Sequence, residues 1–242
     1  MGAALGWGSL SAFSLVLGAL LALARPWPKR LVGLVLAFGA GALISAVSFE
    51  LAQEGFRLGD SGWTAVGLAA GALVYYLLDG VVGRTGSAGR GRSGRASGDS
   101  PGTALALGAF LDGIPEQTVL GIGLAAGQGV GVSLLVAIFV SNLPEAIGSA
   151  NDMREAGRDD RTIVRLWLAV AAVCALATVV GYAFADSVSD NLKAGIDGFA
   201  AGALLVMLVD SMIPDATRDS GRTAGLMTTL GFALAAGLSA AG

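Results

Sequence analysis

Two short stretches place a carboxylate and a proline together inside long apolar segments. The first is FLDGIPEQ at 110–117, and the second is FVSNLPEA at 139–146. In a helix, Asp112 and Glu116 lie four residues apart and share one face. Each proline removes a backbone donor and clashes with the carbonyl four residues back, which frees an oxygen beside the acids. Carboxylate and carbonyl oxygens are the ligands of hard cations, so the paired motifs, with Glu145 in the second, predict a cation site.

The composition places these motifs in a membrane. The chain has 242 residues, of which 54% are apolar and 14% are charged, and its mean hydropathy is +0.72. Soluble domains carry about 25% charged residues, so this composition argues against a soluble Ala/Gly-rich enzyme. The sequence contains no histidine and one cysteine, Cys174, which we interpret as a small buried hydrophobe that has no partner for a disulfide within the chain.

Apolar segments of roughly 20 residues recur along the whole chain, and each is long enough to cross a bilayer as a helix. They are continuous and not alternating, which favours helices over a β-barrel. We predict an all-α integral membrane protein in which residues 1–242 form a single transmembrane domain with eight transmembrane helices. The predicted spans are 5–24, 31–52, 63–82, 103–126, 130–150, 163–185, 192–213 and 223–241.

Basic residues set the expected orientation. Thirteen of the fifteen Lys and Arg residues fall in alternate connections, and only Arg57 and Lys193 fall in the others. Cytoplasmic loops carry the excess of basic residues, so we expect both termini outside the cytoplasm of a multi-pass plasma-membrane protein. The Gly-, Ser- and Arg-rich stretch at 84–101 cannot bury a core, and we interpret it as a flexible cytoplasmic loop between the third and fourth helices.

The second and seventh spans contain an internal repeat. FGAGALI at 38–44 matches FAAGALL at 199–205 with an offset of 161, and the same offset aligns Glu54 with Asp215. Spans that are five apart in an alternating chain point in opposite directions. This predicts an inverted repeat in a 3+2+3 arrangement, in which spans one to three are related to six to eight. Such repeats are typical of transporters whose site lies near the bilayer midplane.

Other polar residues extend the candidate site. Ser141 and Asn142 cluster with Glu145 in span five, and VDSMIPDA in span seven offers Asp210 and Ser211 as an approximate third copy of the motif. An acid at the middle of a membrane helix costs about 2.5–3.5 kcal/mol on insertion scales and usually faces a polar interior. For Glu50, Glu54 and Asp215 we favour solvated helix ends. Glycines spaced four apart, as at 67 and 71, permit close helix packing.

At these residues the chain resembles the ZIP (Zrt-, Irt-like protein) family of divalent-metal transporters. The motifs of that family are His-Asn-x-Pro-Glu in helix four, x-x-x-Pro-Glu in helix five and a later Arg-x-Ala-Gly. Here they read DGIPE from Asp112, SNLPE from Ser141 and REAG from Arg154. The resemblance covers nearly the whole chain, and it implies eight helices, outside termini, a variable loop between helices three and four, and a 3+2+3 inverted repeat.

The resemblance also implies a binuclear metal site in the middle of helices four and five. The implied ligands are Glu116 and Glu145 as bridging carboxylates, with Asp112, Ser141 and Asn142, and a contribution from helix seven near Asp210 and Ser211. The family's His is Asp112 here, and its Asn is Gly113. An all-oxygen site shifts preference from zinc towards Mn²⁺, Fe²⁺ or Mg²⁺. The glycine supplies no side chain for a second metal.

We therefore expect a secondary transporter that moves a divalent cation of the zinc, manganese or iron class into the cytoplasm by alternating access. The cation is the substrate, and we expect no organic cofactor, no enzymatic activity and no nucleic-acid partner; a homodimer in the bilayer remains open. One alternative is a family member that has lost metal transport and moves protons or another small solute, or senses metal. Another is an intramembrane aspartyl protease that pairs Asp112 with Asp210.

Overall fold

The computed structural model of the protein describes residues 1–85, 101–125, 132–187 and 189–241, and the regular structure in these ranges is entirely helical. The predicted loop at 84–101 lies almost wholly outside them. The long helices, with their short π and 3₁₀ segments, are α1 (Gly2–Ala24), α2 (Lys29–Ala46), η1 (Val47–Ala52), α3 (Gln53–Leu58), α4 (Ser61–Thr85), α5 (Pro101–Ala125), α6 (Val132–Glu155), α7 (Asp160–Phe184), η2 (Ala185–Ser187), α8 (Asp190–Met207), η3 (Leu208–Met212), α9 (Ile213–Ser220) and α10 (Thr223–Ala241).

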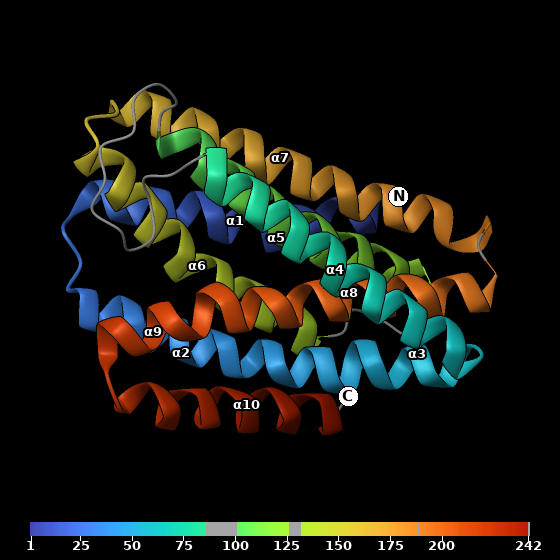
Figure 1. Ribbon diagram of the computed structural model, residues 1–242. Coiled ribbons are helices and arrows are strands. Elements are labelled where there is room, and N and C mark those ends of the chain that lie inside the picture. Colours follow the sequence, from blue (N-terminus) through green and yellow to red (C-terminus); the bar gives the residue numbers. More distant parts are fainter. Residues whose placement is uncertain (86–100, 126–131, 188, 242) are drawn as a thin grey trace.

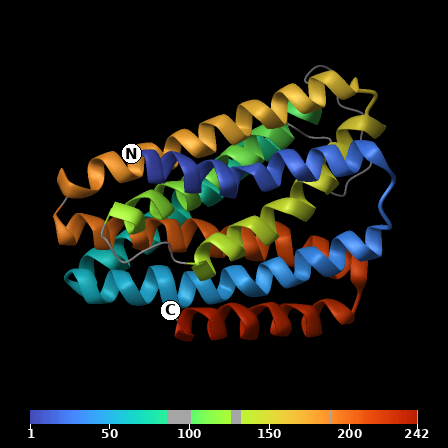
Figure 2. The same ribbon diagram turned by 180° about the vertical axis from the view of Figure 1, so that it is seen from behind.

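The helices lie alongside one another in a bundle, and both chain termini lie in the same half of it (Figures 1 and 2). The turns α1–α2, α6–α7 and α9–α10 gather at one end. Contacts bind these turns together: Arg154 Nη1 donates to the Leu23 carbonyl at 3.2 Å, and a side chain on Gly33 would meet Asp219 at 2.7 Å. Three of the four basic connections predicted to lie on one side of the membrane therefore lie at one end of the bundle, and the fourth, 84–101, lies almost wholly outside the described residues.

Seven helical stretches within the described residues are long and apolar enough to cross a membrane. The predicted fourth span, 103–126, coincides with α5, whose first half has no described side chains. Two stretches run beyond the predicted spans. Helix continues from α2 to Leu58 and from α8 to Ser220, because ion pairs three residues apart, Glu54–Arg57 and Asp215–Arg218, suit a helix after the apolar run ends.

The offset of 161 found in the sequence recurs in the helix boundaries. Residues 29–46 of α2 correspond to 190–207 of α8, and the π-helical segments η1 and η3 begin at equivalent positions, Val47 and Leu208. The ion pairs Glu54–Arg57 and Asp215–Arg218 are equivalent too. The helices α2 and α8 run in opposite directions through the bundle (Figure 1).

Glycines let the backbones of these helices approach closely. A β-carbon on Gly41 of α2 would lie 1.8 Å from the Thr228 carbonyl oxygen of α10. A β-carbon on the equivalent Gly202 of α8 would lie 2.0 Å from the Leu68 carbonyl oxygen of α4. A β-carbon on Gly67 or Gly71 of α4 would meet the backbone of α8 in the same way. The pairs α2–α10 and α8–α4 therefore use the same packing, with glycine at each contact as expected of membrane helices.

Two clusters of buried apolar side chains divide the bundle. One lies between α2, α8 and α10 and includes residues of α5 and α6, such as Leu120 and Ile138. The other joins α1, α6 and α7 around Trp167. The helix α5 packs chiefly against α7, and α6 packs against both α1 and α2. The group α1, α5, α6 and α7 thus meets the group α2, α4 and α8–α10 along α5 and α6.

Candidate functional site

The two Pro-Glu motifs lie in the inner parts of the consecutive helices α5 and α6. Glu116 comes nine residues before the end of α5 at Ala125, and Asn142 comes ten residues after the start of α6 at Val132. At 1.5 Å per residue, these residues are about 14 Å and 15 Å from those ends of their own helices. Both motifs therefore lie near the middle of their helices, as the sequence predicted.

Glu116 lies on the face of α5 that packs into the interior of the bundle. Its side chain is 1% exposed, and Val119 and Leu120, three and four residues later, belong to the cluster around α2 and α8. Asp112 precedes it by one turn in the same helix, but the Asp112 side chain lies outside the described part of the structure. An ionised carboxylate at this depth requires a compensating positive charge or hydrogen bonds.

The second motif faces α2 and the π-helical segment of the α8 stretch. Ser141 is buried and its hydroxyl donates to the Ile138 carbonyl at 3.0 Å. A β-carbon on Gly39 of α2 would meet the Ser141 Cα at 2.8 Å and the Met212 methyl of η3 at 3.2 Å. Gly39 of α2 therefore contacts both α6 and η3 at the same position along α2. Ser141 and the segment that carries Ser211 are consequently close in depth.

The neighbouring Asn142 is 4% exposed, and its Nδ2 atom has no hydrogen-bond partner among the described residues. Glu145, three residues later, is half-buried on the same helix. A buried amide end without a partner costs about 1–3 kcal/mol, and such groups in native proteins usually have a functional reason. The Nδ2 group is a donor and does not bind cations, so a cation ligand at this residue would be the amide oxygen.

Gly113, which stands where the family motif has Asn, is packed against α7. A β-carbon there would lie 2.5 Å from the Cys174 sulfur. The space that a side chain at position 113 would occupy is thus taken by the thiol of α7. The glycine allows this close approach of the two helices, which explains the departure from the motif in physical terms. Cys174 itself is buried, as predicted.

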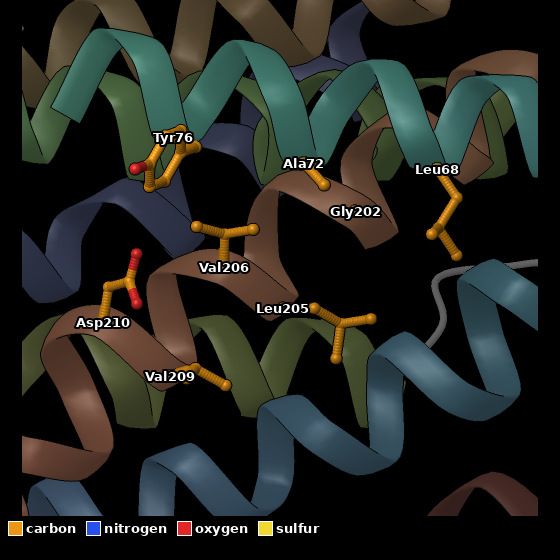
Figure 3. A pocket seen from close by; sticks show the side chains of 8 residues that line it. All are labelled: Leu68, Ala72, Tyr76, Gly202, Leu205, Val206, Val209 and Asp210. Carbon is orange, nitrogen blue, oxygen red and sulfur yellow. The ribbon is translucent and has the colours of Figure 1, made fainter. Parts of the chain in front are cut away.

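Asp210 lies on the outer side of the helix pair α4–α8. It lines a pocket of about 400 Å³, together with seven mainly apolar residues that include Tyr76 and Val209. Its side chain is exposed and points from η3 towards α4, on the side where Tyr76 lies (Figure 3). Ser211 is half-buried and donates to the Met207 carbonyl at 3.0 Å. The pocket contains neither Glu116 nor Asn142, so the structure does not bring Asp210 together with them.

The acids at the helix ends are held by neighbouring side chains. Ser239 of α10 donates a hydrogen bond of 2.7 Å to Glu50, whereas Glu54 and Asp215 pair with the arginines three residues later. All three acids are half-buried. They are therefore more enclosed than the solvated helix ends that the sequence favoured.

Among the buried polar residues that the sequence analysis missed are Asp197 and Gln117. Asp197 of α8 is 5% exposed, and the charged side chains that act on it are Glu54 and Lys193. Gln117, the residue after Glu116, is fully buried and hydrogen-bonded to α1 and α7. The signal for Asp197 is its spacing of four and seven residues from Ala201 and Leu204, both buried on the same face. Gln117 could be suspected from its place next to the motif.

The REAG stretch turns the chain between α6 and α7. Gly157 has φ of +83°, and Gly157 N–H and Arg158 N–H donate to carbonyls of the last turn of α6 at 3.0 Å and 3.1 Å. This is a helix end with a left-handed residue, where glycine has no steric cost. Arg154 bonds the last turn of α1 and lies 3.5 Å from Asp160 of α7. The motif thus joins three helix ends.

Within the described residues, no three carboxylate or thiol side chains lie close enough together to hold a metal ion. The two Pro-Glu motifs contribute two carboxylates whose side chains are described, Glu116 and Glu145. The side chain of the third acid, Asp112, lies outside the described part of the structure. Amide and hydroxyl oxygens, those of Asn142 and Ser141, lie within one turn of Glu145 on α6. The donor set is therefore one of hard oxygen ligands on two helices.

Comparison with known proteins decides the family. The model of the family described as ZIP Zinc transporter matches residues 91–239, which include both motifs and more than half of the chain. The chain belongs to the ZIP family. This ZIP protein is thus a member of a family of multi-pass membrane transporters of zinc and related metals, in agreement with its long apolar helices.

One relative is an Arabidopsis thaliana protein named "Putative zinc transporter At3g08650". It is 28% identical to this ZIP protein over 192 residues, which are 78% of this chain and 30% of the plant protein. The chain thus spans about a third of the length of that relative.

Proposed function

We propose that this ZIP protein carries a divalent metal cation across the plasma membrane into the cytoplasm by alternating access. Its ligands are the carboxylates Asp112, Glu116 and Glu145, with Asn142 and Ser141 beside them. The observation that carries the proposal is the burial of Glu116 and Asn142 in the inner parts of α5 and α6, the two helices along which the helix groups meet. A cation between them would offset the cost of keeping the acids ionised in the bilayer.

The moving parts of the proposal are the two helix groups that meet along α5 and α6. A 3+2+3 inverted repeat is supported by the equivalent boundaries of α2 and α8, by the equivalent segments η1 and η3, and by the equivalent contacts of Gly41 and Gly202. In this scheme one group rocks against the other and exposes the site to each side in turn. Asp210 and Ser211 of η3 are second-rank ligand candidates. The segment η3 comes close to Ser141 through Met212, but Asp210 lines the outer pocket at α4.

Metal uptake into proteoliposomes tests the proposal. Mn²⁺, Fe²⁺, Zn²⁺, Co²⁺, Cd²⁺ and Mg²⁺ are compared in the wild type and in Glu145→Ala. Glu155→Ala is the control, because Glu155 is an exposed acid at the end of the same helix. We expect uptake that Glu145→Ala abolishes and Glu155→Ala retains. If Glu145→Ala and Glu155→Ala lose uptake equally while both remain folded, Glu145 is not a specific ligand of the cation. If the wild type takes up no metal, the alternative of lost metal transport is favoured.

The choice of metal is the second part of the same experiment. An all-oxygen site favours Mn²⁺, Fe²⁺ or Mg²⁺, whereas the family and the plant relative carry zinc in their names. Asp112→His replaces a carboxylate by the imidazole that the family motif has there. We expect this variant to shift the preference towards Zn²⁺. An unchanged order of the metals would show that Asp112 is not a ligand.

The proposed orientation places both termini outside the cytoplasm. A cysteine at Ser61, the exposed first residue of α4, should react with a membrane-impermeant thiol reagent on intact cells. A cysteine at the exposed Ala156, after α6, should react only after the cells are permeabilised. Cys174 is buried and contributes little background. The opposite pattern would reverse the orientation and with it the direction of transport.

A further inference from the structure

A chain of hydrogen bonds joins α5 to both α1 and α7 at the residue after Glu116. Gln117 Nε2 donates to the Ser11 hydroxyl of α1 at 2.8 Å, and the Thr178 hydroxyl of α7 donates to Gln117 Oε1 at 2.6 Å. Ser14 completes the network by donating to the Ser11 carbonyl at 2.7 Å. These side chains are fully buried. A hydrogen bond to each helix fixes both the height and the rotation of α5.

The Gln117 amide is not a substitute for the missing Asn of the motif. It lies one turn after Gly113 and one turn before Gly121, and these two glycines pack against Cys174 and Thr178 of α7. Gln117 therefore shares their face towards α7, whereas Glu116 is turned about 100° away, towards the interior. Both ends of the amide already have partners, so the side chain is available for structure and not for a cation.

The helix α1, which accepts the hydrogen bond from Gln117, also packs against the second motif on α6. A β-carbon on Gly18 of α1 would lie 2.5 Å from the Leu143 carbonyl oxygen and 2.7 Å from the Ala146 β-carbon. These residues flank Glu145. Ser11 and Gly18 are seven residues apart, and so they lie on one face of α1 and about 10 Å apart along it. One rigid helix thus spaces the carboxylate of α5 from that of α6.

We propose that Gln117 is a positioning residue, which holds α5 on α1 and α7 so that Glu116 keeps its place relative to Glu145. This inference rests on the proposed function, because Glu116 and Glu145 are the ligands of the cation there. Without the amide, α5 is free to turn or slide against α1 and α7. The two carboxylates then no longer meet the cation at one fixed separation, and binding weakens while the ligands themselves remain.

Three variants test the positioning role. Gln117→Met keeps the length of the side chain but removes both hydrogen bonds, and Thr178→Val keeps the shape of the threonine but removes its donor. Thr178→Ser retains the hydroxyl and is the conservative control. We measure Kd for Mn²⁺ and Cd²⁺ in detergent, and KM and Vmax in proteoliposomes, per folded molecule. We expect Gln117→Met and Thr178→Val to raise Kd and KM about tenfold with Vmax within about twofold. Thr178→Ser should stay close to the wild type.

The double variant distinguishes positioning from general damage. Gln117→Met with Thr178→Val should be little worse than Gln117→Met alone, because both changes break the same chain of bonds. Unchanged Kd and KM with less folded protein would overturn the proposal and leave a purely structural network. The proposal would also be overturned if the fold-increase of Kd in the double variant equalled the product of the fold-increases in the two single variants.

A distance measurement keeps the proposal testable apart from transport. Spin labels at the exposed positions Ile114 of α5 and Ala156 after α6, in a Cys174→Ala background, report the placement of the two helices. We expect a narrow distribution in the background protein and with Thr178→Ser, and a shifted or broadened one with Gln117→Met. An identical distribution would refute the positioning role. A wild type that binds no cation while Gln117→Met broadens the distribution would refute the proposed function alone.

Discussion

The glycine contacts predict a destabilisation that can be calculated from the structure. In Gly41→Ala, the new methyl carbon would lie 1.8 Å from the Thr228 carbonyl oxygen, whereas an ordinary contact begins at 3.4 Å. The helices α2 and α10 must therefore separate by about 1.6 Å. A gap of 0.5–1 Å already loses a quarter to a half of the dispersion energy between facing atoms. We expect the free energy of unfolding to fall by about 3 kcal/mol, at the upper end of overpacking effects.

The control for this variant is Gly225→Ala on α10. A β-carbon there meets nothing within 4 Å, so the substitution adds no clash, and the better helix propensity of alanine leaves stability unchanged or raises it by up to about 1 kcal/mol. Unfolding in mixed micelles with increasing dodecyl sulfate, followed by tryptophan fluorescence, measures both variants. Equal stability of Gly41→Ala and Gly225→Ala would refute the close approach of α2 and α10.

The equivalent position extends the test to the repeat. Gly202→Ala places its methyl carbon 2.0 Å from the Leu68 carbonyl oxygen in the interface of α8 with α4. Because this contact is equivalent to that of Gly41 with α10, we expect a loss of stability of similar size. A large effect at Gly41 and none at Gly202 would show that the two interfaces are not equivalent, which would count against the inverted repeat.

Three further predictions concern single contacts. Gly113→Ala should lower stability by about 1–3 kcal/mol through its clash with the Cys174 sulfur, and Cys174→Ala should restore most of the loss, as a double-mutant cycle in micelles would show. Gly157→Ala should cost about 1 kcal/mol, because its φ of +83° is unfavourable for alanine, and a thermal melt beside the wild type checks this. Hydrogen bonds from Thr162 hold the pKa of Asp159, the N-cap of α7, below its usual value. A lowered pKa in the folded state stabilises the protein above the unfolded pKa of about 4, and this contribution is lost as pH falls through the folded pKa. Asp159→Ala should therefore be less stable than the wild type at neutral pH, and the difference should shrink on acidification; a difference independent of pH would contradict the assignment.

Much of the architecture could be read from the sequence because the bilayer imposes it. A continuous apolar run of about 20 residues can cross a membrane only as a helix. Seven of the predicted spans therefore coincide with helical stretches in the described residues that are long and apolar enough to cross a membrane, and the fourth coincides with α5. The stretches of the second and seventh spans extend six and seven residues beyond their predicted ends. The offset of 161 was visible because Gly41 and Gly202 must both be small for two backbones to touch. The burial of Glu116, Ser141 and Asn142 was also predictable, because polar residues in lipid-spanning helices face inwards.

The tertiary structure alone decided which face each helix turns towards its neighbours. In water an apolar stripe marks the buried face, but in lipid both faces are apolar, and the Gly- and Ala-rich helices of this chain carry little of that signal. Hence Gln117 and Glu116, adjacent in sequence, have different roles, and Asp197 is buried while Asp210 lies in an outer pocket. The rotation of each helix is determined by close contacts such as that of Gly113 with Cys174, which exist only once the bundle is assembled.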